Sequence, residues 1–252
     1  MKLISSNIFL KHKLEGHVER PERIKRLLTE LEFEKADKGD IYLHLVHTPE
    51  YIEKVKNMSL EAGDRIRHID AGDTYVTAET YNVAVTAVGA AVKAADYVLK
   101  GQNAFALVRP PGHHAHPGWT GGFCIFNNAA IGAAYMLQKG KKVLIFDFDM
   151  HRGDGTQDCV KQLNKHFPGK VYYFSINQEG VFPGASLDEG NVYNVYLPPG
   201  TTENEYLELM RKELDYRIKQ FRPDAIVISA GFDCFAKDAE QYYPRLGCAL
   251  LL

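Results

Sequence analysis

Short apolar segments alternate along this sequence with longer segments of helical period, and this alternation limits the folds that the chain can adopt. Strands are predicted at residues 42–46, 104–108, 143–148, 171–176, 192–197 and 225–229. Helices are predicted between them, at residues 21–31, 49–58, 78–99, 129–138, 157–166 and 203–221. Strands that alternate with helices form βαβ units. We therefore expect one α/β domain over residues 1–252, with a doubly wound, mostly parallel sheet and helices on both faces.

Charge and composition exclude several classes of partner. The chain of 252 residues has 30 basic and 32 acidic side chains, so no overall basic field draws it onto nucleic acid or an anionic membrane. The four cysteines are far apart and form no Cys-x-x-Cys pair, which favours reduced thiols. No uninterrupted apolar run approaches the length of a bilayer span. We expect a cytoplasmic protein, or a nuclear one if the source is eukaryotic, with no direct contact to nucleic acid or membrane.

Three predicted strands are followed by residues that can do chemistry. These segments are Arg-Pro-Pro-Gly-His-His at 109–114, Asp-Phe-Asp-Met-His at 147–151 and Ala-Gly-Phe-Asp at 230–233. Open parallel sheets bind ligands beyond the carboxyl ends of their strands. The sequence therefore places the candidate site at this edge of the sheet.

The segment 147–151 has the pattern of a metal site. Alternate side chains of a strand share one face, so Asp147, Asp149 and His151 are predicted to point the same way. Carboxylate oxygens and an imidazole suit a divalent transition ion, and Asp233 is placed to add a ligand from another strand end. The alternative is that Asp147 and Asp149 cap the next helix or pair with Arg152.

The histidine pair and two aromatic residues add a second element. His113 and His114 follow a rigid Pro-Pro-Gly turn, where adjacent imidazoles can divide the roles of acid and base. The glycine-rich stretch 118–124 could be a flexible loop, or it could let backbone approach a ligand and present Phe123 as an apolar wall. Phe182 could form the opposite wall, although a single loop aromatic is more often packing.

Taken together, these segments closely resemble the histone deacetylase superfamily, which includes bacterial deacetylase-like amidohydrolases and acetylpolyamine amidohydrolases. The motifs that carry the resemblance stand at residues 16–23, 73–76, 109–115, 122–128, 147–156 and 229–233. The first two are more similar to the class II and bacterial branches than to class I. The resemblance implies an arginase/deacetylase-like fold and a zinc-dependent hydrolase that removes acetyl groups from acetylated lysine or polyamine amines.

The resemblance also implies roles for individual residues. One zinc ion per chain would be bound by Asp149, His151 and Asp233. His114 would be the general base with Asp154 as its partner, and His113 would pair with Asp147. The remaining implied residues are those of the substrate channel, Phe123, Phe182, Gly122 and Asp73, and those near a structural K⁺ ion, Asp147, Asp149, His151 and Ser175.

The sequence departs from the family after Asp233. Family members continue to a Gly-Gly-Tyr loop whose tyrosine stabilises the oxyanion, and neither Tyr242 nor Tyr243 has that context here. This leaves a second hypothesis, a weakly active or inactive module that binds a metal or an acyl-amine. A third, an arginase-like binuclear manganese hydrolase, is disfavoured because the histidine pair stands where further carboxylates would be needed. The apolar residues 246–252 are predicted to form a substitute strand beside residues 225–229 or to pack over the gap.

Overall fold

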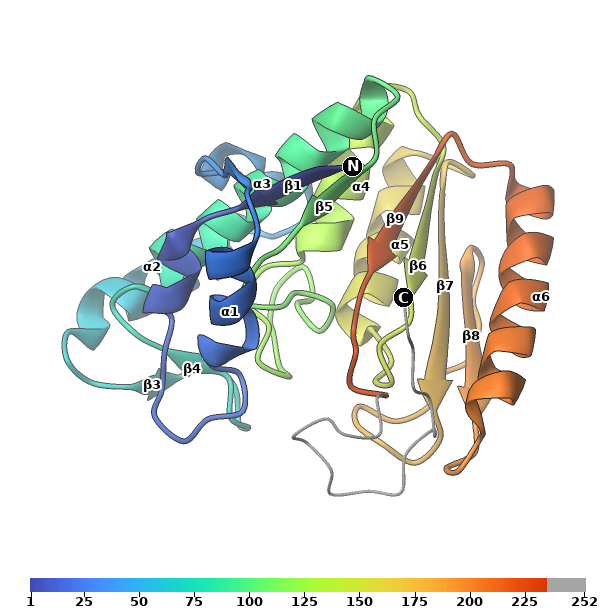
Figure 1. Cartoon of the computed structure of the whole chain (residues 1–252). Coiled ribbons are helices and arrows are strands. Elements are labelled where there is room, and N and C mark those ends of the chain that lie inside the picture. Colours follow the sequence, from blue (N-terminus) through green and yellow to red (C-terminus); the bar gives the residue numbers. More distant parts are fainter. Residues whose placement is uncertain (235–252) are drawn as a thin grey trace. The chain divides into compact units, whose positions relative to one another are not determined.

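The computed structural model describes residues 1–234, and the chain divides into two compact units, Met1–Lys139 and Gly140–Leu252. The predictions made for Tyr242, Tyr243 and residues 246–252 lie outside the described residues. Each unit combines parallel strands with helices (Figure 1). The α/β class is therefore confirmed, with the parallel strands distributed over a three-stranded and a four-stranded sheet.

The first unit is built on a small parallel sheet in the order β2-β1-β5. Its strands are β1 (Lys2–Ser5), β2 (Glu34–Lys35) and β5 (Ala104–Ala106), and β3 (Arg67–His68) pairs antiparallel with β4 (Tyr75–Val76). Its helices are η1 (Asn7–Lys11), α1 (Glu22–Glu30), η2 (Asp40–Leu45), α2 (Pro49–Ala62), α3 (Thr80–Leu99) and α4 (Asn128–Gln138). Strands β1 and β2 were not predicted, because both are short and β2 consists of charged residues.

The strand predicted at residues 42–46 is wrong, since most of this segment forms the 3-10 helix η2. The cause lies just before it, at Gly39. The backbone N–H of Gly39 donates to the carbonyl of Val85 at 2.8 Å, and a Cβ on Gly39 would lie only 2.5 Å from the backbone nitrogen of Gly89 in α3. This close approach of two backbones holds the chain against α3, and the residues that follow form the 3-10 helix.

Helix α3 is the central helix of the first unit. Among the described helices, it alone is long and apolar enough to cross a membrane, although polar residues interrupt its apolar runs. However, 56% of its most apolar window is buried inside the protein. Its buried face includes Val83 and Ala87, which pack with Phe9, Ile24 and Leu28. Its apolar composition is that of a core helix.

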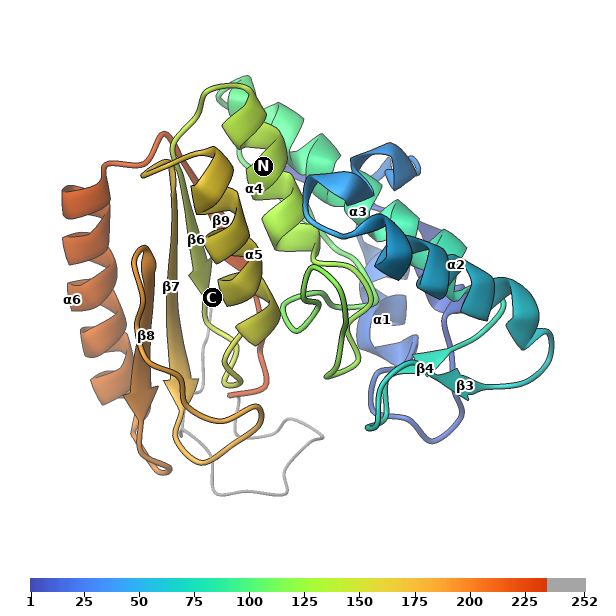
Figure 2. The ribbon, with the colours of Figure 1, turned by 180° about the vertical axis from the view of Figure 1, so that it is seen from behind.

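The second unit is a four-stranded parallel sheet in the order β8-β7-β6-β9. Its strands are β6 (Val143–Asp147), β7 (Val171–Gln178), β8 (Val192–Leu197) and β9 (Ala225–Ser229). Helices α5 (Asp154–His166) and α6 (Glu203–Phe221) lie on opposite faces of this sheet (Figures 1 and 2). Strand β6 is buried along its whole length, because it lies between β7 and β9 in a sheet that helices cover on both faces.

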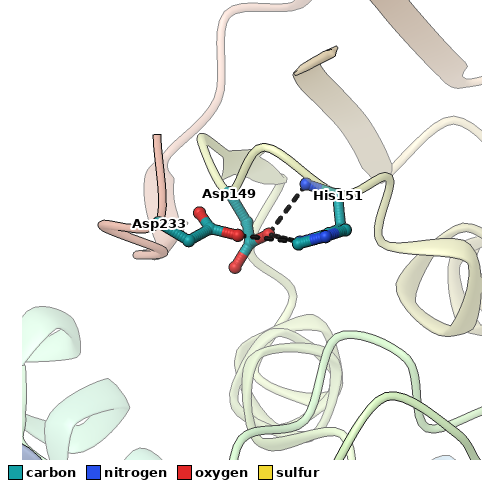
Figure 3. A group of neighbouring side chains, drawn as sticks. All are labelled: Asp149, His151 and Asp233. Atoms are coloured by element: carbon teal, nitrogen blue, oxygen red, sulfur yellow. Dashed lines mark hydrogen bonds and ion pairs between the residues drawn. The ribbon is translucent and has the colours of Figure 1, made fainter. Parts of the chain in front are cut away.

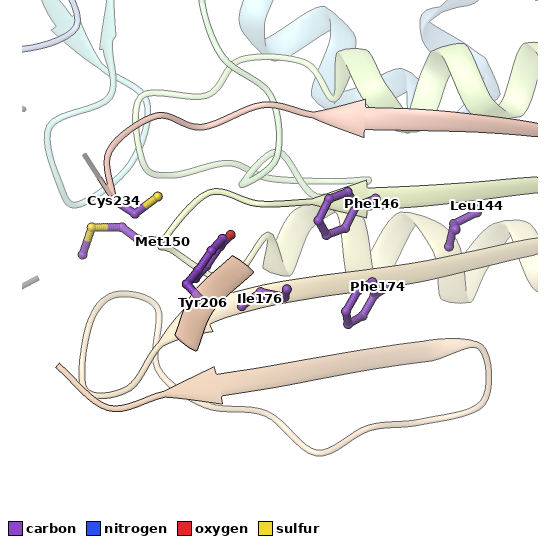
Figure 4. Close-up of a cluster of buried hydrophobic side chains, with 7 residues drawn as sticks. All are labelled: Leu144, Phe146, Met150, Phe174, Ile176, Tyr206 and Cys234. Atoms are coloured by element: carbon purple, nitrogen blue, oxygen red, sulfur yellow. The ribbon is translucent and has the colours of Figure 1, made fainter. Parts of the chain in front are cut away.

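The core beneath α6 fixes the position of the sheet's carboxyl edge. Leu144 and Phe146 of β6 pack with Phe174 and Ile176 of β7 and with Tyr206 of α6 (Figure 4). Helix α6 begins with a capping box, in which Thr202 and Glu205 satisfy each other's backbone N–H groups. Met150 and Cys234, which follow β6 and β9, belong to the same cluster. The segments that leave the two strands are thus anchored in the core.

Candidate metal centre and histidine turn

Strands β6 and β9 bring two distant segments of the chain together. Their register pairs Asp147 with Ser229, so the segments 148–151 and 230–233 leave the sheet side by side. Asp149, His151 and Asp233 have ligand atoms that all lie within 4.8 Å of one another (Figure 3). Their side chains are only 18%, 23% and 13% exposed, respectively. The three predicted metal ligands therefore form one compact, partly buried group.

The two carboxylates of this group strongly favour a positive charge beside them. The Nδ1 atom of His151 lies 2.7 Å from Oδ2 of Asp233 and 3.1 Å from Oδ1 of Asp149. Burial disfavours the imidazolium, but the two carboxylates outweigh it and raise the pKa of His151 to about 10. Burial, and then the charge of Asp149, raise the pKa of Asp233. Two oxygen donors and one imidazole fit a divalent transition ion, which would neutralise the carboxylates as the proton does.

Backbone contacts hold the carboxylates in place. The N–H of Met150 donates to Oδ1 of Asp233 at 3.0 Å, and the N–H of His151 donates to Oδ1 of Asp149 at 2.8 Å. A Cβ on Gly231 would lie 2.0 Å from Oδ2 of Asp149, so only glycine fits beside that carboxylate. The interpretation of the two aspartates as helix caps does not hold, because α5 begins after Gly153.

Asp147 has surroundings different from those of Asp149. It is fully buried, and its carboxylate accepts hydrogen bonds from the N–H of Asp149 at 3.1 Å and from the hydroxyl of Tyr173 at 3.2 Å. Ser175 is its neighbour across the β6–β7 pair and donates to Oδ1 of Asn177 at 2.6 Å. These buried oxygen atoms at one sheet edge suit a monovalent cation, which remains a prediction.

Two other predicted site residues lie in the second unit. Asp154 is the first residue of α5 and is buried, whereas Phe182 follows β7 in a loop and is 55% exposed. Arg152, which follows His151, connects this loop to the candidate metal centre, because its Nε atom donates to the carbonyl of Gly184 at 2.8 Å. This role was not predicted, because a hydrogen bond to a backbone carbonyl leaves no pattern in the sequence.

The first unit carries the two candidate catalytic histidines on a tight turn. We call this segment, residues 110–117, the histidine turn. The rings of His113 and His114 are buried, with centroids 3.9 Å apart. Hydrogen-bond donors reach the backbone carbonyls on both sides of the two histidines, at residues 110–112 and 115–117. The pairs are Asn128 Nδ2 with Pro110, Ile125 N with Pro111, Ala115 N with Gly112, Asn127 Nδ2 with Ala115, His47 Nδ1 with His116 and Thr48 N with Pro117. The backbone that presents both histidines is thereby fixed.

A buried ion pair anchors the start of this turn. Arg109 and Glu19 are 2% and 1% exposed, and the Nε atom of Arg109 donates to Oε1 of Glu19 at 2.8 Å. A second guanidinium nitrogen contacts Oε2 of Glu19, and a third donates to the carbonyl of Phe9. The pair explains why the motif at residues 16–23 accompanies the histidine motif, although the sequence did not indicate that the two segments meet.

Three residues predicted for the substrate channel lie in the first unit, and one of them, Gly122, passes over the ring of His114. A Cβ on Gly122 would lie 2.3 Å from Cδ2 of His114, so glycine is required where the chain passes over this ring. Phe123 follows with a positive φ of 65°. Asp73 is exposed, and its carbonyl lies 3.2 Å from Nε2 of His17. No role was predicted for His17 or His47, because no sequence pattern marks a histidine that bridges backbone groups.

Comparisons with known proteins show which family this chain resembles. Residues 12–246 match the histone deacetylase domain family. The chain is 32% identical to an uncharacterized protein of Methanocaldococcus jannaschii, over 99% of this chain and 79% of that protein. It is 33% identical to a probable deacetylase of Archaeoglobus fulgidus, over 89% of this chain and 67% of that protein. The crystal structure of an acetylpolyamine aminohydrolase from Burkholderia pseudomallei superimposes with a TM-score of 0.82 and 25% identity, covering 98% of this chain and 86% of that one.

Proposed function

Because the chain belongs to the histone deacetylase domain family, we propose that it is a zinc-dependent hydrolase that removes acetyl groups from acetylated lysine side chains or polyamines. The observation that carries the proposal is the group of Asp149, His151 and Asp233 at the carboxyl edge of the second unit's sheet. Three protein ligands that leave a position open are typical of catalytic rather than structural zinc. One ion per chain is proposed, with K⁺ as a structural ion near Asp147 and Ser175.

The histidine turn would supply the proton transfers. When bound, zinc would act as a Lewis acid that makes water more acidic and polarises the amide carbonyl. In this proposal His114 removes a proton from the attacking water, with Asp154 as the carboxylate that sets its protonation state. His113 has Asp147 in the same role, and a protonated imidazole of the pair donates to the departing amine. Residues 1–252 would work as one catalytic domain.

The apolar residues would select the shape of the substrate. Phe123 and Phe182 are proposed as walls for the slender aliphatic stem of an acetylated amine, and Gly122 lets the backbone approach it. Asp73, at an exposed turn, would hold a polar group of the substrate at the rim. Lysine side chains and polyamines share such a stem, so both remain within the proposed substrate class. Family membership favours turnover over a module that only binds a metal or an acyl-amine.

The proposal is tested by replacing the candidate base and measuring metal and activity separately. In His114→Ala, release of acetate from an acetyl-lysine peptide and from an acetylated diamine should fall by roughly 100-fold or more. Zinc content should stay near one ion per chain, because a base is not a ligand. The matched control is His44→Ala, an exposed histidine in the same unit, which should leave both quantities unchanged.

Two results would contradict this proposal. Equal loss of zinc in His114→Ala would make this histidine a ligand and overturn the division of roles. Absence of acetate release by the zinc-loaded wild-type protein on both substrates would instead favour the binding module.

A further inference from the structure

Phe123 has a backbone conformation that an aromatic residue rarely adopts. Its φ is 65°, and Gly122 before it has a φ of 54°, so two consecutive residues are left-handed. The left-handed region costs a residue with a Cβ roughly 1–2 kcal/mol. Such a conformation persists where the surrounding structure holds it, and strained residues of this kind cluster at functional sites. The contacts that hold Phe123 therefore identify residues with a role in the site.

A hydroxyl group holds the backbone of Phe123. The N–H of Phe123 donates to Oγ1 of Thr74 at 3.0 Å, and Thr74 is fully buried. The hydroxyl of Thr74 donates in turn to Oδ2 of Asp70 at 2.6 Å, while Oδ1 of Asp70 accepts the backbone N–H of Thr74 at 3.1 Å. A threonine hydroxyl has one hydrogen and two lone pairs. Because Asp70 takes the hydrogen, a lone pair of Oγ1 is left for Phe123.

A histidine holds the ring of Phe123. The rings of His17 and Phe123 meet edge to face, with centroids 5.0 Å apart and planes at 88°. The Nδ1 atom of His17 accepts the backbone N–H of Glu19 at 3.0 Å, so the neutral ring carries its hydrogen on Nε2, which donates to the carbonyl of Asp73. The turn of residues 70–74 is thus connected to both the backbone and the ring of Phe123.

We propose that Thr74 and Asp70 are positioning residues that hold Phe123 as a rigid wall and so determine which substrate stems are accepted. This inference rests on the proposed function, because Phe123 is a wall only if an acyl-amine lies against it. A rigid wall favours an unbranched stem over a methyl-branched one. A hydrophobic site that discriminates by one methyl group typically does so by about 10- to 200-fold. Releasing Phe123 should reduce that ratio.

The test compares Thr74→Val with Thr74→Ser. The valine side chain has nearly the shape of threonine but offers no acceptor to Phe123 and no hydroxyl donor to Asp70, whereas serine keeps the hydroxyl. In Thr74→Val, hydrogen exchange of the Phe123 amide should accelerate by about tenfold. The ratio of kcat/KM for linear over methyl-branched acetylated amines should fall by about tenfold, mainly through a higher KM for the linear one. Thr74→Ser should stay close to wild type in both measurements.

The two measurements distinguish a failure of the inference on Thr74 from a failure of the proposed function. A purely structural role for Thr74 would accelerate exchange throughout the first unit and leave the selectivity ratio unchanged, which would overturn the inference. An unchanged exchange rate at Phe123 in Thr74→Val would overturn it as well. Acceleration confined to the region of Phe123, together with the lower ratio, would support it. Lack of turnover by wild type on any acetylated amine would refute the proposed function, while amide exchange would still decide whether Thr74 holds Phe123.

Discussion

The Nε2 atom of His47 accepts a hydrogen bond from the backbone N–H of Asn127 at 2.9 Å. Its Nδ1 atom therefore carries the hydrogen and donates to the carbonyl of His116 at 3.0 Å. Burial lowers the pKa of His47 to about 4, although its backbone hydrogen bonds act in the opposite direction. The neutral imidazole is thus a bridge between the histidine turn and the start of α4. A second proton on the ring would remove the acceptor that Asn127 needs.

This bridge predicts a dependence of stability on pH. Between about pH 6.5 and 4 the unfolded chain binds a proton at His47 that the folded protein does not bind. The free energy of unfolding should therefore fall as pH falls through this range, by up to about 1.4 kcal/mol per pH unit from this residue. Burial also lowers the pKa of His12, to about 3, so His12 adds to the slope.

Denaturant unfolding of His47→Gln at several pH values measures the contribution of His47. Glutamine keeps a donor and an acceptor but does not titrate, so the slope between pH 6.5 and 4 should be smaller than in wild type without disappearing. His44→Ala, which removes an exposed histidine, should keep most of the wild-type slope. If His47→Gln has the same slope as wild type, the pKa of His47 is not depressed in the folded protein.

The buried pair of Arg109 and Glu19 predicts a large loss of stability. Glu19→Ala leaves the guanidinium buried without its main partner, which typically costs about 3–5 kcal/mol. The control pair is Arg26 and Glu30, whose side chains are 84% and 52% exposed. Glu30→Ala should cost less than about 1 kcal/mol. Equal effects of the two variants on the free energy of unfolding would show that the buried pair adds nothing beyond an ordinary surface contact.

Removal of one proposed ligand should abolish metal binding while the fold remains. In Asp149→Ala, zinc measured by elemental analysis after gel filtration should fall from one ion per chain to nearly none. Circular dichroism should change little, because Asp149 lies beyond the end of β6. Asp215→Ala, an exposed acidic residue of α6, is the matched control. Undiminished zinc in Asp149→Ala would show that the ion binds elsewhere.

Gly231→Ala tests the same centre without removing a ligand. The added methyl group would meet the Asp149 carboxylate at 2.0 Å, so this carboxylate must leave its present position. We expect zinc affinity to drop by at least about tenfold, because loss of the contacts that orient one metal ligand typically has an effect of this size. Gly118→Ala is the control, because its added methyl group meets no atom within 4 Å. Zinc titration with a chromophoric chelator measures both affinities.

Strong periodic patterns predicted much of the fold. The boundaries of β8, β9 and α6 agree with the prediction, and the other five predicted helices are present with shifted ends. These segments have long helical periods or β-branched runs bounded by turn residues. The failure at η2 has a tertiary cause, the packing of Gly39 on Gly89. A local pattern contains no information on such a contact between segments about 50 residues apart in the chain.

The candidate metal group could be predicted because chain topology alone brings strand ends together. Asp149, His151 and Asp233 follow parallel strands that turn out to be neighbours, β6 and β9. Alternation did not predict the separate position of Asp147, since β6 ends at that residue and the chain turns there. The supporting contacts of Thr74, His47 and Arg152 could not be predicted. They are hydrogen bonds to backbone groups, and such partners leave no periodic pattern in the sequence.

The pairing of Asp147 with Ser229 also determines where this protein can tolerate insertions and deletions. A single residue added within β6 or β9 would shift the register, and a shift by one turns every side chain of the strand to the opposite face. The segments 148–151 and 230–233, which carry the proposed metal ligands, would then no longer lie side by side. The connection between α6 and β9 lies at the other end of the sheet, where added length has little effect on the register. Variation in length among related chains should therefore be concentrated in such connections and be rare in residues 143–151 and 225–233.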